Sequence, residues 1–251
     1  MFRKISAVCF FILTGLLGFA AEPPAPSAPL DPNVQGKRFE SRNIRVNYAL
    51  YLPKAYKADG PAWPLIVFLH GAGSKGDDLK RLEKTGPLTQ VVGKDGRDLP
   101  FIIVAPLCPN TKESWSSSTQ LAALDALHKE LISKYNIDQN RVYLTGLSLG
   151  GSGTWAYASE HPHRFAAILM VSGYGNPKNA VKLSHLPIWL FHGAKDTTIP
   201  MKSSEAIAEA LKTVGNPVEF TIIPEGKHDI WGQVYGNPAI YEWMLKHKGQ
   251  P

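Results

Sequence analysis

Apolar residues along the chain form short continuous runs, and amphipathic segments with apolar positions three and four residues apart lie between these runs. Continuous apolar runs predict buried strands, and the three-to-four spacing predicts helices. Residues 46–52 differ because apolar and polar positions alternate there, which predicts an edge strand at an antiparallel start. The predicted buried strands are 65–69, 101–105, 141–145, 166–172, 186–191 and 218–223, and the predicted helices are 119–135, one from about 152, 203–213 and one near 240–246.

This order of strands and helices predicts the fold class. Strands that are apolar throughout must be covered on both faces, which is typical of parallel strands connected by helices. We therefore predict an α/β protein with a mostly parallel central sheet and helices on both faces. Only about 13 residues, 173–185, separate two of the expected strands, which is too few for a large lid domain.

The first 20 residues form a segment of their own. Arg3 and Lys4 precede an apolar run over residues 7–20, which ends in small residues of the kind that a signal peptidase recognises. We predict a signal peptide over 1–20 and a secreted or periplasmic protein with no stable membrane insertion after cleavage. A membrane anchor is the alternative, but the run is shorter than the roughly 20 residues that cross a bilayer.

The rest of the sequence predicts a linker followed by one domain. Prolines in residues 21–36 predict an extended tether, and residues 37–251 predict a single folded domain. Removal of residues 1–20 lowers the formal net charge from +6 to +4 and leaves Cys108 as the one cysteine, so no intramolecular disulfide can form. The cations form no stripe with interleaved aromatics, and no ligand cluster has metal spacing. We therefore expect no nucleic-acid partner, no metal and no cofactor.

The sequence GLSLGG, residues 146–151, places a serine among glycines at the spacing G-x-S-x-G. A flexible turn would have the same composition, so the neighbouring elements decide between the two interpretations. The strand 141–145 runs directly into Gly146, and a helix follows. A sharp strand-to-helix turn brings two backbones together and holds its middle residue in a strained conformation, which flanking glycines allow. We therefore predict that Ser148 is a nucleophile at the carboxyl edge of the sheet.

A serine hydroxyl needs a base to remove its proton, and the base needs a carboxylate to orient it. His228 and Asp196 each follow an expected strand by one short loop, which places both at the sheet edge where ligands bind in open α/β sheets. The order Ser148, Asp196, His228 is the one expected for this architecture. His70 and His192 each end an apolar strand directly before a glycine, and we interpret both mainly as structural.

The negative oxygen of a tetrahedral intermediate requires two N–H donors held in place. The N–H of Leu149, directly after the serine, is one candidate. The other is the N–H of Ala72 in the sequence HGAG, residues 70–73, whose glycines let the backbone turn inward after a strand. A glycine turn without a catalytic role is the alternative.

Four motifs, HGAG, GLSLGG, HGAKD and GKHDIW, occur in this order, and together they resemble the α/β-hydrolase superfamily. Within it the chain is most similar to secreted bacterial esterases of the phospholipase/carboxylesterase and dienelactone-hydrolase-like groups, near feruloyl and acetylxylan esterases. The likeness covers about residues 38–248. It implies the α/β-hydrolase fold, together with the same triad and the same oxyanion donors that the residues themselves indicate.

The predicted function is hydrolysis of carboxylic esters by a secreted serine esterase, through an acyl-enzyme. The expected substrate is a small or polymer-linked ester, such as an acyl group on a polysaccharide. Trp115, Trp231 and Tyr235 are predicted to form an aromatic wall beside the serine, although aromatic residues at such places are as often part of the core. Two alternatives stay open: a serine peptidase of the prolyl-oligopeptidase type, whose propeller domain has no room here, and a non-catalytic binding protein.

Overall fold

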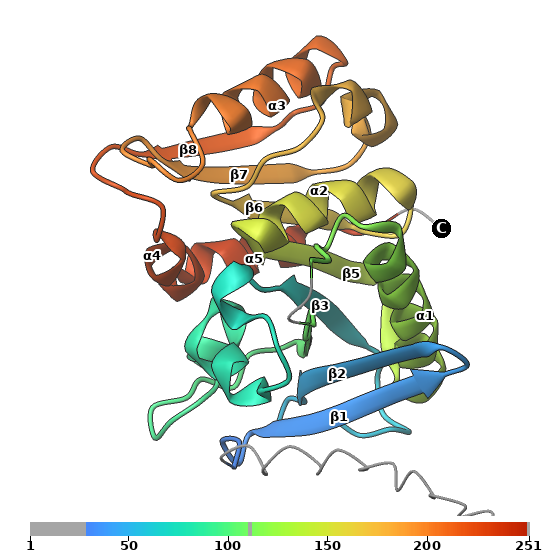
Figure 1. Cartoon of the computed structure of the whole chain (residues 1–251). Coiled ribbons are helices and arrows are strands. Elements are labelled where there is room, and N and C mark those ends of the chain that lie inside the picture. The colour runs from blue at the N-terminus through green and yellow to red at the C-terminus, as the bar shows by residue number, and fades with distance from the viewer. Residues whose placement is uncertain (1–28, 110–111, 250–251) are drawn as a thin grey trace, which may run out of the picture.

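In the computed structural model, which describes residues 29–109 and 112–249, eight strands form one sheet in the order β1-β2-β4-β3-β5-β6-β7-β8 (Figure 1). β2 pairs antiparallel with β1 and with β4, and the other neighbours are parallel. The predicted mostly parallel sheet is therefore confirmed. The strands are β1 Val34–Ser41, β2 Ile44–Tyr51, β3 Trp63–Leu69, β4 Ile102–Pro106, β5 Ile137–Leu147, β6 Ala167–Val171, β7 Ile188–Gly193 and β8 Glu219–Ile223.

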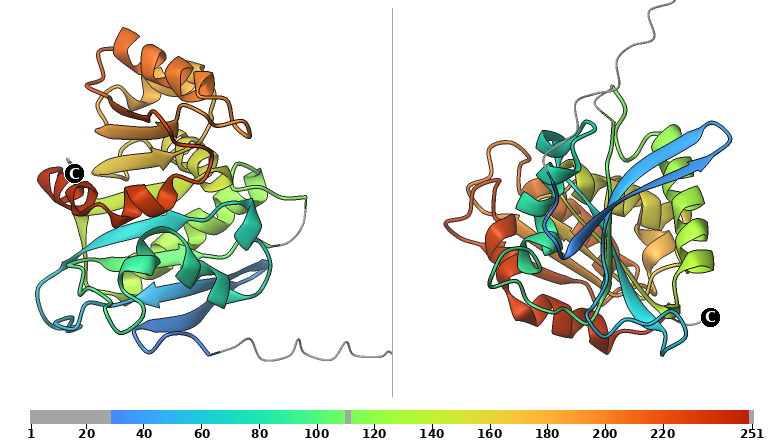
Figure 2. Two further views of the ribbon diagram at one scale, coloured as in Figure 1. Left: turned by 90° about the vertical axis from the view of Figure 1, so that its left-hand side faces the viewer. Right: turned by 90° about the horizontal axis from the view of Figure 1, so that it is seen from below.

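Helices cover both faces of the sheet, as the view from below in Figure 2 shows. α1, α2 and α3 pack on one face, against strand residues such as Leu65 and Val67, and α4 and α5 pack on the other, against residues such as Ile66 and Phe68. Successive side chains of a strand point to opposite faces, which explains why these strands are apolar at every position. The helices are α1 Ser118–Lys134, α2 Leu149–Glu160, α3 Lys202–Thr213, α4 Trp231–Gly236 and α5 Pro238–Lys246, and the short 3₁₀ helices are η1 Ala72–Ser74, η2 Leu79–Lys84, η3 Gly86–Gln90 and η4 Pro177–Leu183.

The predicted tether over residues 21–36 extends too far, because the folded part of the chain begins earlier. β1 starts at Val34, and the carboxylate of Asp31 already accepts the N–H of Gly93 at 2.8 Å. Val34 is the one buried residue of β1, and most of the other residues of this strand are polar. β1 therefore lacks the continuous apolar run by which the buried strands were predicted. Since β1 is outermost, the prediction of an edge strand over 46–52 is wrong, and β2 lies between two strands. The predicted signal peptide and the first part of the tether fall outside the described residues.

The functional candidates lie at one edge of the sheet. Since β3, β5, β7 and β8 all lie parallel within it, the loops that follow them leave from the same carboxyl edge. These loops carry residues 70–73, Ser148, Asp196 and His228. The predicted elements around them are present, except that α2 begins at Leu149 and the short α4 was not predicted.

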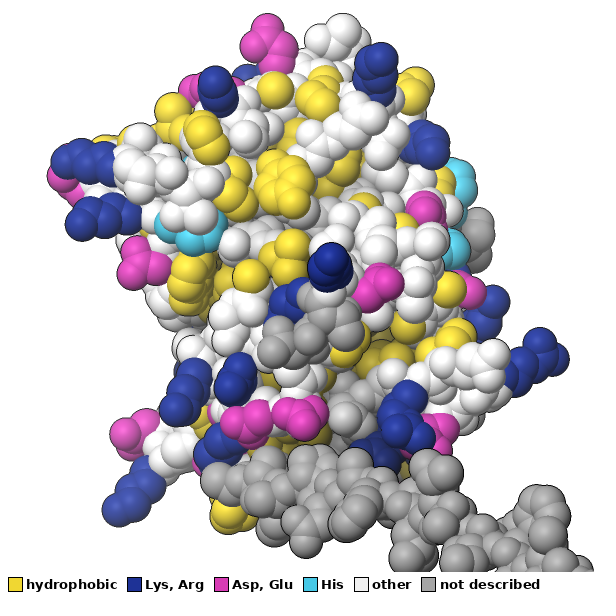
Figure 3. Space-filling model, viewed as in Figure 1, with side chains coloured by type: hydrophobic (Ala, Val, Ile, Leu, Met, Phe, Trp, Pro, Cys, Tyr) yellow, Lys and Arg dark blue, Asp and Glu magenta, His cyan; other side chains and the backbone are white. Residues whose placement is uncertain are grey.

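The surface shows no single dominant charge pattern on the face drawn in Figure 3. Lys and Arg side chains are scattered over that face, and hydrophobic side chains gather on its upper half. Within the described part of the chain, none of the helices combines the length and the apolar character that a membrane span needs.

Candidate active site

Ser148 is the single residue between β5 and α2. Its φ of 53° and ψ of −117° are unusual for an L-residue, and such a conformation persists only where the surrounding structure enforces it. The flanking glycines permit the close packing that enforces it. A Cβ on Gly150 would lie 1.8 Å from the carbonyl oxygen of Leu69, and a Cβ on Gly146 would lie 2.3 Å from the carbonyl oxygen of Gly150. The predicted sharp turn from strand to helix is confirmed.

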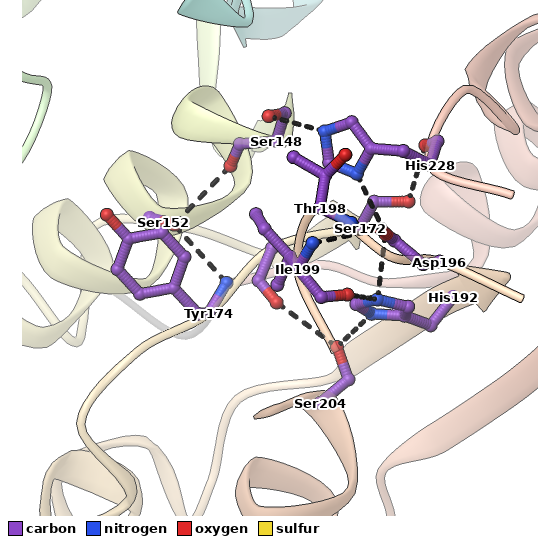
Figure 4. Close-up of polar contacts among 11 residues, drawn as sticks. Ser148, Ser152, Ser172, Tyr174, His192, Asp196, Thr198, Ile199, Ser204 and His228 are labelled. Atoms are coloured by element: carbon purple, nitrogen blue, oxygen red, sulfur yellow. Dashed lines mark hydrogen bonds and ion pairs between the residues drawn. The ribbon is translucent and has the colours of Figure 1, made fainter. Parts of the chain in front are cut away.

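The side chains of the three predicted residues meet, as Figure 4 shows. Ser148 Oγ lies 2.9 Å from Nε2 of His228, and Nδ1 of His228 lies 2.7 Å from Oδ2 of Asp196. An ionised carboxylate can only accept a hydrogen bond, so Nδ1 carries the proton of the neutral ring and Nε2 can accept the serine hydroxyl. Residues far apart in the sequence thus form one hydrogen-bonded chain, which is the arrangement that activates a serine.

Asp196 stays ionised although its side chain is fully buried. Burial would raise the pKa of Asp196, but hydrogen bonds from His228 and from the backbone outweigh it and hold the pKa below its ordinary value. The backbone N–H groups of Thr198 and Ile199 donate to Oδ1 at 2.8 and 2.9 Å. The carboxylate can therefore orient the imidazole and stabilise a positive charge on it.

A hollow of about 580 Å³ opens beside Ser148 and His228, with Ala72 in its lining. Ala72 is the first residue of η1, and Leu149 is the first residue of α2. N–H groups in the first turn of a helix have no acceptor within that helix. Both predicted oxyanion donors therefore occupy positions where an N–H can bind an oxygen held over the serine.

His70 connects the loop after β3 to the end of β4, in agreement with its structural interpretation. The side chain is fully buried, Nδ1 lies 2.7 Å from the carbonyl oxygen of Gly71, and Nε2 accepts the N–H of Cys108 at 3.0 Å. Because a carbonyl can only accept, Nδ1 carries the proton, and the neutral imidazole satisfies both contacts. Burial lowers the pKa of His70 to about 4.

We expect the free energy of unfolding to fall between pH 7 and pH 4.5, with His70 responsible for about 2.5 kcal/mol of the loss. A histidine in the unfolded chain has a pKa of about 6.5, so the folded state binds fewer protons below that pH. This stability is present above pH 6.5 and is lost as the pH falls toward about 4. Urea unfolding at both pH values measures it. His70→Gln keeps an acceptor for the Cys108 N–H but cannot titrate, so its free energy of unfolding should fall less between pH 7 and pH 4.5 than that of the wild type. An equal fall in both proteins would show that His70 does not cause the loss.

One of the three aromatic residues predicted beside the serine lines the hollow. Trp231 does so, and its ring meets the His228 ring edge-on with centroids 5.5 Å apart. The prediction for Trp115 is wrong, because this ring is buried and its Nε1 donates to a backbone carbonyl of the loop after β3 at 2.9 Å. The prediction for Tyr235 is also wrong, because its buried hydroxyl lies 2.8 Å from Thr145 Oγ1. In each ring the polar atom finds an internal partner, which allows complete burial.

A second hollow of about 620 Å³ shares Thr198 with the first. Its lining includes the apolar residues Pro177, Ile199 and Pro200, and Tyr174 is 47% exposed beside them. Sequence reasoning missed Tyr174, because a loop aromatic has the same local pattern whether it is exposed or buried. Neither hollow resembles a metal centre, since within the described residues no group of three or more His, Cys, Asp or Glu side chains could hold an ion.

Two buried residues that were not predicted to serve the site contact His228 and Asp196 (Figure 4). Ser172 Oγ donates to the carbonyl oxygen of His228 at 3.0 Å, and Ser172 adopts a left-handed φ of 47°. His192 lies with Nε2 3.1 Å from Oδ2 of Asp196. No sequence pattern marks Ser172. The position of His192, four residues before Asp196 at a strand end, is a signal that could have been used.

Known proteins resemble this chain in sequence and in fold. A sequence model of the family Phospholipase/Carboxylesterase matches residues 108–238. A provisionally named carboxymethylenebutenolidase of Yersinia pestis is 30% identical over 197 residues, which cover 71% of this chain and 72% of that protein. "Probable feruloyl esterase C" of Aspergillus niger is 27% identical over 172 residues, covering 67% of this chain and 61% of that protein. The crystal structure of a thermostable esterase matches with a TM-score of 0.74 and 30% identity, over 86% of this chain and 63% of the esterase.

Proposed function

Because the chain belongs to the phospholipase/carboxylesterase family of α/β-hydrolases, we propose that it hydrolyses carboxylic esters with Ser148 as nucleophile, His228 as base and Asp196 as orienting acid. One observation carries the proposal. The serine hydroxyl, the imidazole and the carboxylate are linked by hydrogen bonds of 2.9 and 2.7 Å beside a hollow that is open to a substrate. A serine hydroxyl is a poor nucleophile unless a base of this kind removes its proton.

In the first half of the proposed reaction, Ser148 Oγ attacks the ester carbonyl carbon while Nε2 of His228 takes the hydroxyl proton. The electron pair of the carbonyl moves to its oxygen, where the N–H groups of Ala72 and Leu149 stabilise the negative charge. The intermediate then collapses, the bond to the alcohol oxygen breaks, and the imidazolium gives its proton to the leaving alcohol. The acyl group remains on Ser148.

In the second half, a water molecule replaces the alcohol. His228 takes one proton from the water as its oxygen attacks the acyl carbon, and the same donors hold the new oxyanion. Collapse breaks the bond to Ser148 Oγ, the serine regains its proton from His228, and the carboxylic acid leaves. Asp196 keeps its charge throughout and stabilises the imidazolium in both halves.

The surroundings of the site support esters that are carried on a bulky group, including acyl groups linked to polysaccharides. The two hollows share Thr198, so a substrate larger than the ester group can contact both. The connection between β6 and β7 holds only the short η4 as regular structure and no lid domain. The apolar residues Pro177, Ile199 and Pro200 of the second hollow offer an apolar surface for such a group.

Tyr174→Ala is expected to lower kcat/KM about three- to tenfold for esters that carry a naphthyl group and to leave methyl acetate hydrolysis unchanged. The half-exposed ring offers an aromatic contact of about 0.5–1.5 kcal/mol, and its loss costs the core little. Kinetics with 1-naphthyl acetate and methyl 2-naphthoate would show whether the second hollow takes the alcohol or the acyl part. Val181→Ala removes an exposed apolar side chain of η4 outside both hollows. An equal effect of the two variants would contradict this role.

We further propose that residues 1–20 direct secretion into the periplasm or the medium and are then removed. The proposal rests on Arg3, Lys4 and the apolar run that follows them, all of which lie outside the described residues. N-terminal sequencing of protein recovered from the periplasm or the medium tests it. We expect Ala21 as the first residue, and a mature protein that still begins with Met1 would contradict the proposal.

Purified protein without residues 1–20 provides the direct test of the reaction. We expect turnover of p-nitrophenyl acetate and covalent labelling of Ser148 by a fluorophosphonate probe, located by peptide mass mapping. Peptide p-nitroanilides are the comparison substrates. Preferential cleavage of the peptide amides would favour a serine peptidase, and a protein that neither turns over esters nor reacts with the probe would favour a binding role.

A further inference from the structure

His192 lies directly behind the acid of the proposed triad. Figure 4 shows the rings of His228 and His192 on opposite sides of the Asp196 carboxylate. Nε2 of His192 lies 3.1 Å from the same oxygen, Oδ2, that Nδ1 of His228 approaches to 2.7 Å. The side chains of His192 and Asp196 are both fully buried. We propose that His192 is a positioning residue that fixes the carboxylate and, through it, the base; this inference rests on the proposed function.

The hydrogen-bond partners of His192 determine where its proton lies. Nε2 faces the Asp196 carboxylate at 3.1 Å and the carbonyl oxygen of Ile199 at 2.9 Å, and neither group can donate. Nε2 must therefore carry a hydrogen, which it donates to the Ile199 carbonyl while the Asp196 oxygen lies beside the same N–H. Nδ1 lies 2.7 Å from Ser204 Oγ, whose hydroxyl can donate to it. The carbonyl of Gly173, at 3.3 Å, is the weaker acceptor for that hydroxyl, so the contacts select the neutral ring with its proton on Nε2.

With this proton in place, hydrogen bonds and the partly positive N–H of His192 surround both oxygens of the Asp196 carboxylate. Oδ1 accepts the backbone N–H groups of Thr198 and Ile199, and Oδ2 accepts Nδ1–H of His228 and lies 3.1 Å from the protonated Nε2 of His192. A carboxylate has about four acceptor positions, so rotation of the group would break several bonds inside a buried site. The contact with His192 is the one side-chain contact among the four that does not come from the base itself.

Loss of this contact should therefore affect the geometry of the base. If the carboxylate turns, Oδ2 moves away from Nδ1 of His228, and the opposite nitrogen moves away from the serine hydroxyl. A misplacement of about 1 Å in a reacting group can cost about a hundredfold in rate without a change in substrate binding. We therefore expect the effect in kcat and not in KM.

Two substitutions at one position separate this role from simple packing. The amide of a glutamine can place an N–H near the position of Nε2, whereas the shorter asparagine reaches only the position of Nδ1. For His192→Asn we expect kcat for p-nitrophenyl acetate to fall about ten- to hundredfold with KM little changed. His192→Gln should recover kcat to within about threefold of the wild-type value. His128→Asn, in α1 and outside both hollows, is the control that should keep the wild-type kcat.

Each kcat is calculated per active site, counted as the Ser148 that a fluorophosphonate labels at completion. Unfolded protein in a poorly folding variant is therefore not mistaken for a slow enzyme. NMR of ¹⁵N-histidine-labelled wild-type protein adds a readout that needs no activity. We expect a protonated Nε2 and an unprotonated Nδ1 for His192, identified as the resonance that Ser204→Ala shifts.

Wild-type kcat per titrated site in His192→Asn, or a proton on Nδ1 in place of Nε2, would overturn the proposal. A wild-type protein that neither hydrolyses esters nor reacts with the probe would instead overturn the proposed function, while the NMR result would still decide the position of the His192 proton. The two failures are therefore distinguishable.

Discussion

Ser148→Ala is expected to reduce kcat for p-nitrophenyl acetate about 10⁴-fold or more while the protein remains folded. Oγ would form the bond to the acyl group, so its loss removes the two-step route and leaves only substrate binding and the oxyanion donors. In the structure Oγ contacts His228 in a hollow and supports no part of the core, so the melting temperature should change little. Steady-state kinetics, thermal unfolding and fluorophosphonate labelling measure these outcomes.

Ser159→Ala is the matched control. It removes the same atom type from α2, the helix that directly follows Ser148, where Ser159 Oγ donates to the carbonyl oxygen of Trp155 at 2.7 Å, away from the hollow. Its kcat should stay within about twofold of wild type, because a lost side-chain bond of this kind affects stability by only about 1 kcal/mol. If the Ser148→Ala protein kept more than about a hundredth of the wild-type kcat, the nucleophile would have to be another group.

The location of the site could be predicted because each of its parts follows a local signal. Apolar runs mark the strands, and parallel strands bring their carboxyl ends to one edge of the sheet. A polar residue shortly after such a run must therefore lie at that edge, and Ser148, Asp196 and His228 all meet this condition. The glycines around the serine mark the turn. The structure brings the three side chains within hydrogen-bonding distance, as the sequence analysis predicted.

The features that depend on packing could not be predicted in the same way. β1 is outermost and mostly polar, so it has no continuous apolar run that would predict a strand. α4 has only six residues, two of them glycines, which is too short for apolar positions to repeat at helical spacing. Trp115 and Tyr235 enter the core because segments far away in the sequence supply partners for their polar atoms. The contact between His192 and Asp196 depends on how the loop after β7 turns back over the end of that strand; the four-residue spacing hints at it but does not specify it.

Gly150→Ala is expected to destabilise the protein by more than about 4 kcal/mol and to abolish ester hydrolysis. Two effects oppose each other. Gly150 lies within α2 and has no left-handed φ, so alanine would favour the helix by about 1 kcal/mol. However, its Cβ would lie 1.8 Å from the carbonyl oxygen and 2.4 Å from the carbonyl carbon of Leu69, both backbone atoms of β3 that no side-chain rotation can move. The collision outweighs the propensity, so α2 and the end of β3 must separate.

That separation affects chemistry as well as stability, because the same contact holds Ser148 and the loop with Ala72 beside each other. We therefore expect kcat per titrated site to fall in whatever fraction of Gly150→Ala protein folds, since the serine and its oxyanion donors no longer face a common carbonyl. Gly236→Ala, at the end of α4, is the control: nothing lies within 4 Å of its Cβ, so stability should stay the same or rise by up to about 1 kcal/mol. Thermal unfolding and active-site titration of both variants decide the matter. A Gly150→Ala protein as stable and active as Gly236→Ala would mean that the elbow does not require the close approach of α2 to β3.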